Sequence, residues 1–287
     1  IVNCNFTNNT ASEDGGAIYI EGKDCTLNNT VFIGNVAHND GGAIEWNGDN
    51  GRVYNLTAIG NYADSDEGYL YGNASEGSSK GGTLVLSGNN MVLEKLNITN
   101  SRVFASHYNG DKPLQGGAVF LTGNNCNITD STFHNCSVNY NKDKSYGGAM
   151  YIIGNNASLI NCNFTKNTAV LGAGAIYIEG SSTFMDNCSV FNNSAKDAGG
   201  IWISGKENTI NNTNISYNKA SGNGGGVYYQ GNNNTVSYSN IDHNTANNGA
   251  NVYMVTNMVG GKLIGCNITN GRASNFGGGV EWLQGSK

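Results

Sequence analysis

Apolar residues alternate with polar or small residues in short runs along the chain, and pairs of glycines separate these runs. The stretch "GGAIYIEG" begins at Gly15, and close copies begin at Gly41, Gly116 and Gly147. In each copy large apolar residues occupy the second and fourth positions after the second glycine, as Ile18 and Ile20 do in "AIYI" and Val119 and Leu121 in "AVFL". Alternation with a period of two predicts β-strands that each bury one face, and does not fit helices.

The copies recur at a nearly constant spacing, most often 25 or 26 residues. Their second glycines are Gly16, Gly42, Gly82, Gly117, Gly148, Gly174, Gly199 and Gly225, and sixteen residues after each comes a Phe, Ala, Ile or Val. Three strands are predicted per unit: the first at "GGAIYI", the second around Leu27 and its equivalents, and the third at the Phe-type position. A period in this range with three strands per unit is typical of a solenoid. We therefore expect an all-β protein, a single-stranded parallel β-helix of about ten coils of about 26 residues, right-handed and forming a single domain over residues 1–287.

Asparagine fills one column of the repeat, three residues after the Phe-type position. Its members are Asn9, Asn35, Asn61, Asn167, Asn193, Asn218 and Asn244. Side-chain amides can hydrogen-bond between stacked coils, and asparagine tolerates the left-handed backbone of tight corners. We interpret this column as structural.

The seven cysteines follow the repeat too. Cys4, Cys162, Cys188 and Cys266 all lie two residues before the Phe-type position, where small core residues are expected. Cys162 and Cys188 fall in consecutive coils, close enough for a disulfide on Cα distance alone. The odd number of cysteines and the lack of a CxxC pair argue against a disulfide framework or a zinc site.

Composition narrows the possible partners. The chain has 287 residues, 13% of them charged, with 42 glycines, one proline and a net charge of −6. Nucleic acid is not an expected partner, because no clusters of lysine and arginine are present. No apolar run is long enough to predict a membrane span. The chain begins and ends inside repeats, so we expect it to be a segment of something longer.

Three consecutive coils carry insertions at the same corner, over residues 62–80, 102–115 and 137–146. Insertions on neighbouring coils must cluster in space, which predicts one lobe beside the first strand of each repeat. Its candidate binding residues are Asp64, Asp66, Tyr69, Tyr71, His107, Tyr108, Tyr140 and Tyr146. Their chemistry suits recognition of carbohydrate or protein, and the alternative is a set of loops that merely vary in length.

The middle residue of the first strand is usually aromatic and should point outward. Phe120, Tyr151, Tyr177, Trp202 and Tyr228 are the candidate ligand-binding members of this column, which also holds Tyr19 and Tyr253. An exposed aromatic stripe is expected to be covered by a sugar or a partner's apolar surface. The alternative is that the rings only stack on one another and stabilise neighbouring coils.

The paired elements "GGAIYI" and "FTNN" resemble the repeats of chlamydial polymorphic outer-membrane proteins. The asparagine-rich phrasing "NCNFTNNTA" resembles adhesin-like surface proteins of methanogenic archaea still more closely. Both resemblances imply a pectate-lyase-type right-handed β-helix at a cell surface. The implied function is extracellular adhesion to a glycan or protein of a partner cell. The alternative is a stalk, sheath or filament component that binds further copies of itself.

A polysaccharide lyase or hydrolase is the least favoured interpretation. Hydrolysis of a glycoside needs two facing carboxylates, whereas the outward column offers only Glu45 and Glu281, far apart in sequence. The four histidines share no metal-ligand or triad spacing. We therefore predict a protein that is not an enzyme and has no catalytic residues, metal or cofactor. Sixteen N-x-S/T sequons support an extracellular location, and the glycosylation candidates are Asn8, Asn73, Asn156 and Asn233.

Overall fold

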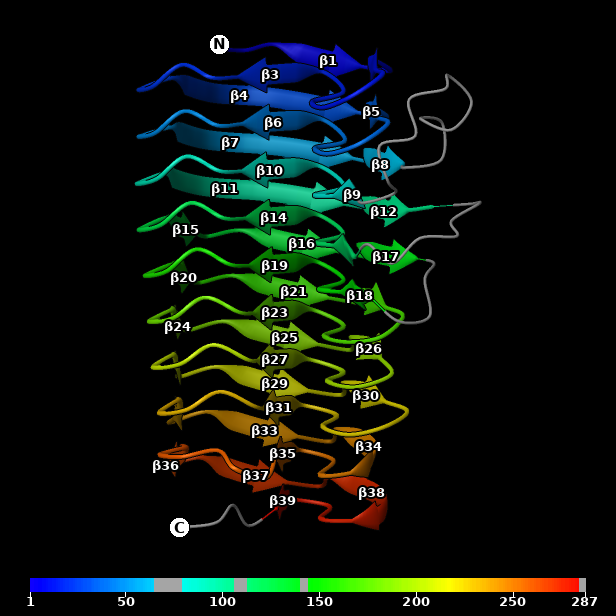
Figure 1. The fold of residues 1–287 in the computed structure, drawn as a ribbon, viewed down its shortest axis with the longest axis vertical. Helices are drawn as coiled ribbons and strands as arrows, with labels where there is room; N and C mark the ends of the chain where they lie inside the picture. Colours follow the sequence, from blue (N-terminus) through cyan, green and yellow to red (C-terminus); the bar gives the residue numbers. More distant parts are fainter. Residues whose placement is uncertain (65–78, 106–112, 140–143, 284–287) are drawn as a thin grey trace.

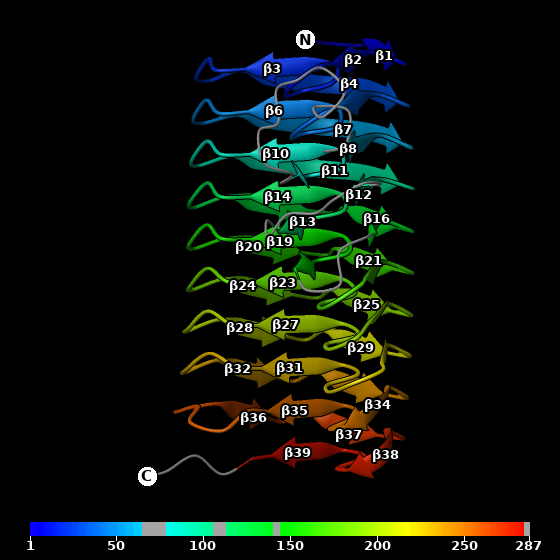
Figure 2. The same ribbon diagram turned by 45° about the vertical axis from the view of Figure 1, so that its right-hand side comes forward.

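The computed structural model describes residues 1–64, 79–105, 113–139 and 144–283, and the strands in them wind into a parallel β-helix (Figure 1). The first sheet contains the "GGAIYI" strands, and we call it the first-strand sheet. It consists of β3 (Ile18–Ile20), β6 (Ile44–Trp46), β10 (Leu84–Leu86), β14 (Val119–Leu121), β19 (Met150–Ile152), β23 (Ile176–Ile178), β27 (Ile201–Ile203), β31 (Val227–Tyr229), β35 (Val252–Met254) and β39 (Val280–Trp282). Figure 2 shows this sheet as an unbroken column from β3 to β39.

A 16-stranded sheet contains both the second and the third predicted strands of each coil. We call it the bent sheet. Its strands are β1 (Asn5–Thr7), β4 (Thr26–Ile33), β7 (Arg52–Ile59), β11 (Val92–Thr99), β15 (Asn127–Thr129), β16 (Thr132–His134), β20 (Ser158–Ile160), β21 (Asn163–Thr165), β24 (Phe184–Asp186), β25 (Ser189–Phe191), β28 (Thr209–Asn211), β29 (Asn214–Ser216), β32 (Thr235–Ser237), β33 (Asn240–Asp242), β36 (Lys262–Ile264) and β37 (Asn267–Thr269). In β4, β7 and β11 the two predicted strands are continuous.

A further ten-stranded sheet follows the asparagine column and was not predicted. We call it the third sheet. Its members are β2 (Thr10–Ala11), β5 (Val36–Ala37), β8 (Tyr62–Asp64), β12 (Arg102–Phe104), β17 (Ser137–Asn139), β22 (Thr168–Ala169), β26 (Ser194–Ala195), β30 (Lys219–Ala220), β34 (Thr245–Asn248) and β38 (Arg272–Phe276). The expectation of three strands per coil was wrong, because each coil has this further strand. Most of these strands have only two or three residues, which is too short to display alternation.

Every pairing between coils is parallel and keeps the repeats in register. Ile44 pairs with Leu84, and Tyr177 pairs with Trp202, each one coil further along the chain. Equivalent side chains therefore lie directly above one another. Inward columns form one continuous apolar core, in which stacked phenylalanines such as Phe133 and Phe164 have ring centroids 4.9 Å apart. The predicted parallel β-helix is confirmed.

The corners require a left-handed backbone, and this explains the abundance of asparagine. Among the described residues 28 that are not glycine have positive φ, and 17 of these are asparagine. After glycine, asparagine adopts this left-handed backbone conformation at the smallest cost in free energy. A second constraint fixes the glycine pairs, because a Cβ on Gly42 would lie 2.1 Å from the carbonyl oxygen of Gly82 in the next coil.

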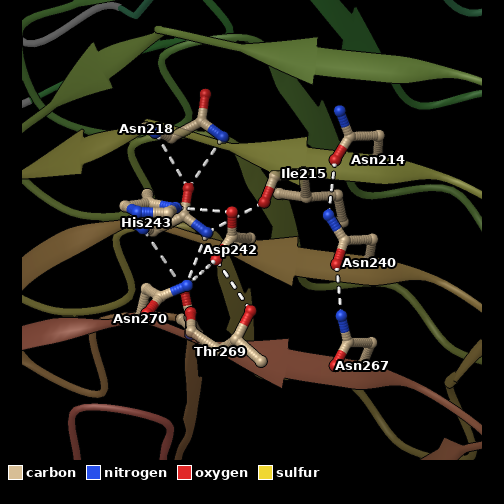
Figure 3. Close-up of polar contacts among 11 residues, drawn as sticks. Asn214, Ile215, Asn218, Asn240, Asp242, His243, Asn267, Thr269 and Asn270 are labelled. Atoms are coloured by element: carbon tan, nitrogen blue, oxygen red, sulfur yellow. Dashed lines mark hydrogen bonds and ion pairs between the residues drawn. The ribbon is translucent and has the colours of Figure 1, made fainter.

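The asparagine column forms a buried hydrogen-bond ladder. The Oδ1 atom of Asn193 accepts from both the backbone N–H and the Nδ2 of Asn167, and its own Nδ2 donates to the carbonyl oxygen of Phe164. Asn193 in turn donates to Oδ1 of Asn218. Buried backbone groups at the corner are thereby satisfied, which confirms the structural interpretation. A second ladder on the surface joins Asn214, Asn240 and Asn267 (Figure 3).

The cysteine column provides hydrogen-bond acceptors for backbone N–H groups at another corner. The Sγ atom of Cys188 accepts from the backbone N–H of Cys162, just as the hydroxyl of Ser239 accepts from the N–H of Thr213. Sulfur and hydroxyl also donate to the carbonyl two residues earlier in both cases. Cysteine therefore replaces serine or threonine in a fixed hydrogen-bonding position. All seven thiols are free in the structure.

Replacing Asn193 by alanine should lower the free energy of unfolding by about 2–4 kcal/mol, because several buried backbone and amide groups lose their only partner. Asn163→Ala is the matched control: Asn163 is exposed on β21, and its loss should cost less than about 0.5 kcal/mol. Urea unfolding followed by circular dichroism measures both. Equal midpoints for the two variants would contradict a structural role for the ladder.

Candidate functional site

The described ends of the three corner insertions meet in a small sheet. It consists of β9 (Ser79–Lys80), β13 (Leu114–Gln115) and β18 (Ser145–Tyr146), and we call it the lobe sheet. Leu114 pairs with Ser79 on one side and Ser145 on the other. The predicted clustering of the insertions is confirmed for these residues. Asp66, Tyr69, Tyr71, Asn73, His107, Tyr108 and Tyr140 lie outside the described residues.

The aromatic residues of the first-strand sheet form one stack along the rod, which we call the aromatic ladder. Its members are Phe120, Tyr151, Tyr177, Trp202, Tyr228 and Tyr253, with neighbouring ring centroids 4.2–5.7 Å apart. The ring planes of Tyr151 and Tyr177 are almost parallel, with an angle of 2° between them. Because the strands are parallel and in register, the backbone places each ring over the next. The stacking alternative is therefore present in the structure.

The expectation that the whole column is exposed was wrong. Phe120 and Tyr151 are only 5% and 4% exposed, because the lobe sheet packs on them. Tyr146 sets its ring edge-on to Tyr151, Tyr177 and Trp202, and the Lys80 ammonium lies 5.4 Å from the Phe120 ring centroid. Lobe and ladder are thus one packed surface, and only its lower part, from Tyr177 to Tyr253, is partly accessible.

Stacking determines what the ladder can offer a ligand. The ring faces pack against neighbouring rings, so only the outward ring edges and the polar groups remain available to a ligand. The Tyr151 hydroxyl donates to Glu179 at 2.6 Å, and Trp202 Nε1 donates to Gln230 Oε1 at 3.0 Å. Burial raises the pKa of Tyr228 to about 12, so its hydroxyl stays a neutral donor. The repeat pattern did not reveal Glu179 and Gln230, because their column varies from coil to coil.

A cluster of carboxyl groups lies above the ladder and was also missed. Asp14 accepts hydrogen bonds from the Asn39 side chain and the Asp40 backbone N–H, and Lys80 pairs with Asp40 at 3.6 Å. Glu45 is 8% exposed, and its Oε2 has no hydrogen-bond partner among the described residues. Burial, then the charges of Asp40 and Asp14, raises the pKa of Glu45 to about 8. Asp64 of β8 is also buried.

The described part of the chain contains neither a candidate metal site nor a candidate membrane-spanning helix. No three histidine, cysteine, aspartate or glutamate side chains there are arranged to hold a metal ion. No helix among those residues has the length and apolar character to cross a membrane.

The glycosylation candidates differ in how their amides are used. Asn8, Asn156 and Asn233 are all exposed at left-handed corners. The Nδ2 of Asn156 donates to Asn125 Oδ1 at 3.1 Å, so one of its two amide hydrogens already takes part in a surface ladder. Asn8 and Asn233 make no such donation to another described residue, and they remain the better predicted acceptors.

Comparison with known proteins agrees with this architecture. The model of the right-handed β-helix region family matches residues 108–260, which is more than half of the chain, and the chain belongs to that family. The repeat of chlamydial polymorphic membrane proteins matches residues 3–21 and 29–45, so that resemblance is confirmed. No curated protein and no solved structure matches the chain. The resemblance to methanogen proteins stays a prediction.

The stability of the rod should fall as pH rises from about 4.5 to 8. Glu45 is protonated in the fold up to about pH 8, whereas an unfolded chain ionises it near pH 4.5, so its contribution is present at low pH and lost towards pH 8. We expect a loss of about 2 kcal/mol between pH 6 and 8. Glu45→Gln should remove most of this pH dependence, as measured by urea unfolding.

The exposed Glu13 supplies the control for this titration. Glu13→Gln should retain the full pH dependence of the unmodified chain. If Glu45→Gln and Glu13→Gln behave alike, another group causes the effect and the buried carboxyl of Glu45 is not protonated at neutral pH.

Proposed function

We propose that this chain is a non-enzymatic, adhesin-like β-helix displayed outside the cell, which binds a glycan or protein of a partner cell. The match to a repeat of chlamydial polymorphic membrane proteins supports a surface location. The observation that carries the binding role is the packing of the lobe sheet on the aromatic ladder. It makes one face of an otherwise regular rod chemically distinct.

This lobe-and-ladder face has the features of a recognition surface. Rings held by stacking lose little freedom when a ligand binds, so they bind at low entropic cost. Glu179 and Gln230 add hydrogen-bonding groups that are already oriented by Tyr151 and Trp202. A small set of oriented polar groups beside aromatic surface is typical of ligand sites. Catalysis is less well supported, because the Glu45 carboxyl is buried and the carboxylate of Asp40 pairs with Lys80.

Self-association as a stalk or sheath is the second candidate. The parallel register that stacks coil on coil within the chain would also allow copies to associate through their strands. The two candidates make different predictions, because a stalk should assemble without any ligand and without the ladder's polar groups.

Trp202→Ala should weaken ligand binding at the lobe-and-ladder face by about tenfold, since it removes a large ring and the Nε1 donor. Binding is measured on an array of neutral glycans, acidic glycans and extracellular proteins. Trp202→Tyr, which restores the ring found in neighbouring coils, should recover most of it. Phe184→Ala, which truncates an exposed ring on the bent sheet, should leave binding unchanged.

Two results would contradict adhesion through this face. One is unchanged binding by Trp202→Ala. The other is the absence of any ligand together with concentration-dependent assembly in sedimentation velocity, which would support the stalk.

A further inference from the structure

Three charged side chains near the aromatic ladder are stacked in one column. Asp14, Asp40 and Lys80 each stand immediately before the glycine pair of three consecutive coils. The backbone aligns them, because the N–H of Gly41 donates to the carbonyl oxygen of Lys80 at 2.9 Å. The parallel register therefore holds the side chain of Lys80 beside that of Asp40, one coil away.

The ion pair of Lys80 with Asp40 is more enclosed than the other lysine–carboxylate pairs of the described residues. Lys80 Nζ lies 3.6 Å from Asp40 Oδ2, and the two side chains are 29% and 18% exposed. The lysines of the other pairs, Lys23 and Lys95, are 70% and 49% exposed. On another side the Lys80 ammonium faces the Phe120 ring. Shielding from water weakens the solvation that keeps an amine and a carboxyl group charged.

A buried acid completes the cluster. Glu45 is 8% exposed, and neither its Oε2 nor the Oδ1 of Asp40 has a hydrogen-bond partner among the described residues. The charges of Asp40 and Lys80 both act on the Glu45 carboxyl group. Burial is the largest cause that raises the pKa of Glu45 to about 8 and the pKa of Asp40 to about 6. Both acids therefore hold a proton more readily than exposed carboxyl groups do, and two buried oxygens lack a partner that they need.

We propose that Lys80 and Asp40 react with each other to form an isopeptide bond, with Glu45 as the proton donor. The bond joins Nζ of Lys80 to Cγ of Asp40 and releases one water molecule. The product is a neutral amide in place of a shielded ion pair, and its carbonyl oxygen accepts from the protonated Glu45. This covalent modification is independent of any ligand and of the proposed function.

The reaction needs only proton transfers, and no oxidant or reductant. The Lys80 ammonium first passes a proton to Oδ2 of Asp40, which leaves a neutral amine beside a neutral acid. The Nζ lone pair then attacks Cγ while the Glu45 proton moves to Oδ1, and Glu45 takes a proton back from Nζ. Finally the bond from Cγ to Oδ2 breaks, and Oδ2 leaves as water with the proton of Glu45. The proton on Oδ1 returns to Glu45, which ends in its starting state.

Proximity favours the amide at this position. Well-oriented groups within one molecule react with effective molarities of about 10⁵–10⁸ M, and the register of the coils supplies that orientation here. The bond also closes the chain between Asp40 and Lys80, a segment that includes most of the first insertion, and it fastens β9 of the lobe sheet to the preceding coil. Such a link restricts the unfolded chain and so stabilises the fold.

Mass spectrometry of the whole denatured chain tests the bond, on protein produced without glycosylation and kept reduced. We expect a mass about 18 Da below that of the sequence, which is the loss of one water. A protease that cleaves after glutamate should then release residues 22–45 joined to residues 77–94, two segments that are not contiguous.

Lys80→Arg is the sharpest variant, because the guanidinium keeps the positive charge but stays protonated and cannot attack. It should show the full mass of its sequence and no joined segments. Lys95→Arg is the matched control, since it alters an exposed ion pair, and it should still lose one water. Circular dichroism should show the same fold for both variants.

Glu45→Gln tests the proton donor. The linked fraction is measured by mass at set times after a pulse of synthesis. Glu45→Gln should form the bond at least about tenfold more slowly, because an amide cannot supply the proton. Glu13→Gln, which changes an exposed acid, should form it at the rate of the unmodified chain.

The proposal is overturned if the unmodified chain has the full mass of its sequence, or if Lys80→Arg also loses water. The second result would indicate a succinimide at Asp40, which precedes Gly41 and can lose water to its own backbone. Equal rates for Glu45→Gln and Glu13→Gln would exclude Glu45 as the proton donor.

Discussion

The rod depends on one constraint: each coil must place its corners directly over those of the previous coil. Corner backbone groups then lie in the interior, where water cannot satisfy them. The buried ladder from Asn167 through Asn193 to Asn218 solves this, because the Asn193 side chain accepts from the coil before and donates to the coil after. Where asparagine is absent, as at Cys136, the backbone N–H still donates to Asn167 of the next coil.

Register also governs the surface, because outward side chains must stack as strictly as inward ones. Tyr151 and Tyr177 lie 4.6 Å apart for the same reason that Phe133 and Phe164 lie 4.9 Å apart. An outward aromatic column in a parallel sheet therefore stabilises itself and presents edges to solvent. Stacking and recognition are not exclusive, but stacking limits recognition to ring edges and to the polar groups beside them.

Sequence periodicity was sufficient to predict the architecture, since every coil repeats the same physical problem. The β-helix and the structural asparagines followed from repeated columns such as that of Asn193, and the clustering of the insertions followed from their position at the same corner of three consecutive coils. Periodicity could not predict burial of Phe120 and Tyr151, which depends on how the insertions fold back over the ladder. It also could not predict Glu45 as a buried acid, because its environment comes from Asp14 and Asp40 in two different coils.

In a repeat protein, each coil can be compared with the equivalent positions of the other coils. A residue that departs from the usual one at such a position therefore indicates a local requirement. Most coils show which residue the corner tolerates without strain, so Tyr217 and His243 mark positions where another requirement outweighs stability. Such a requirement can be binding or packing between neighbours. Packing alone explains His243, which Asp242 holds against Tyr217. It leaves about half of the Tyr217 surface exposed, at 51%, so packing covers only one part of this ring.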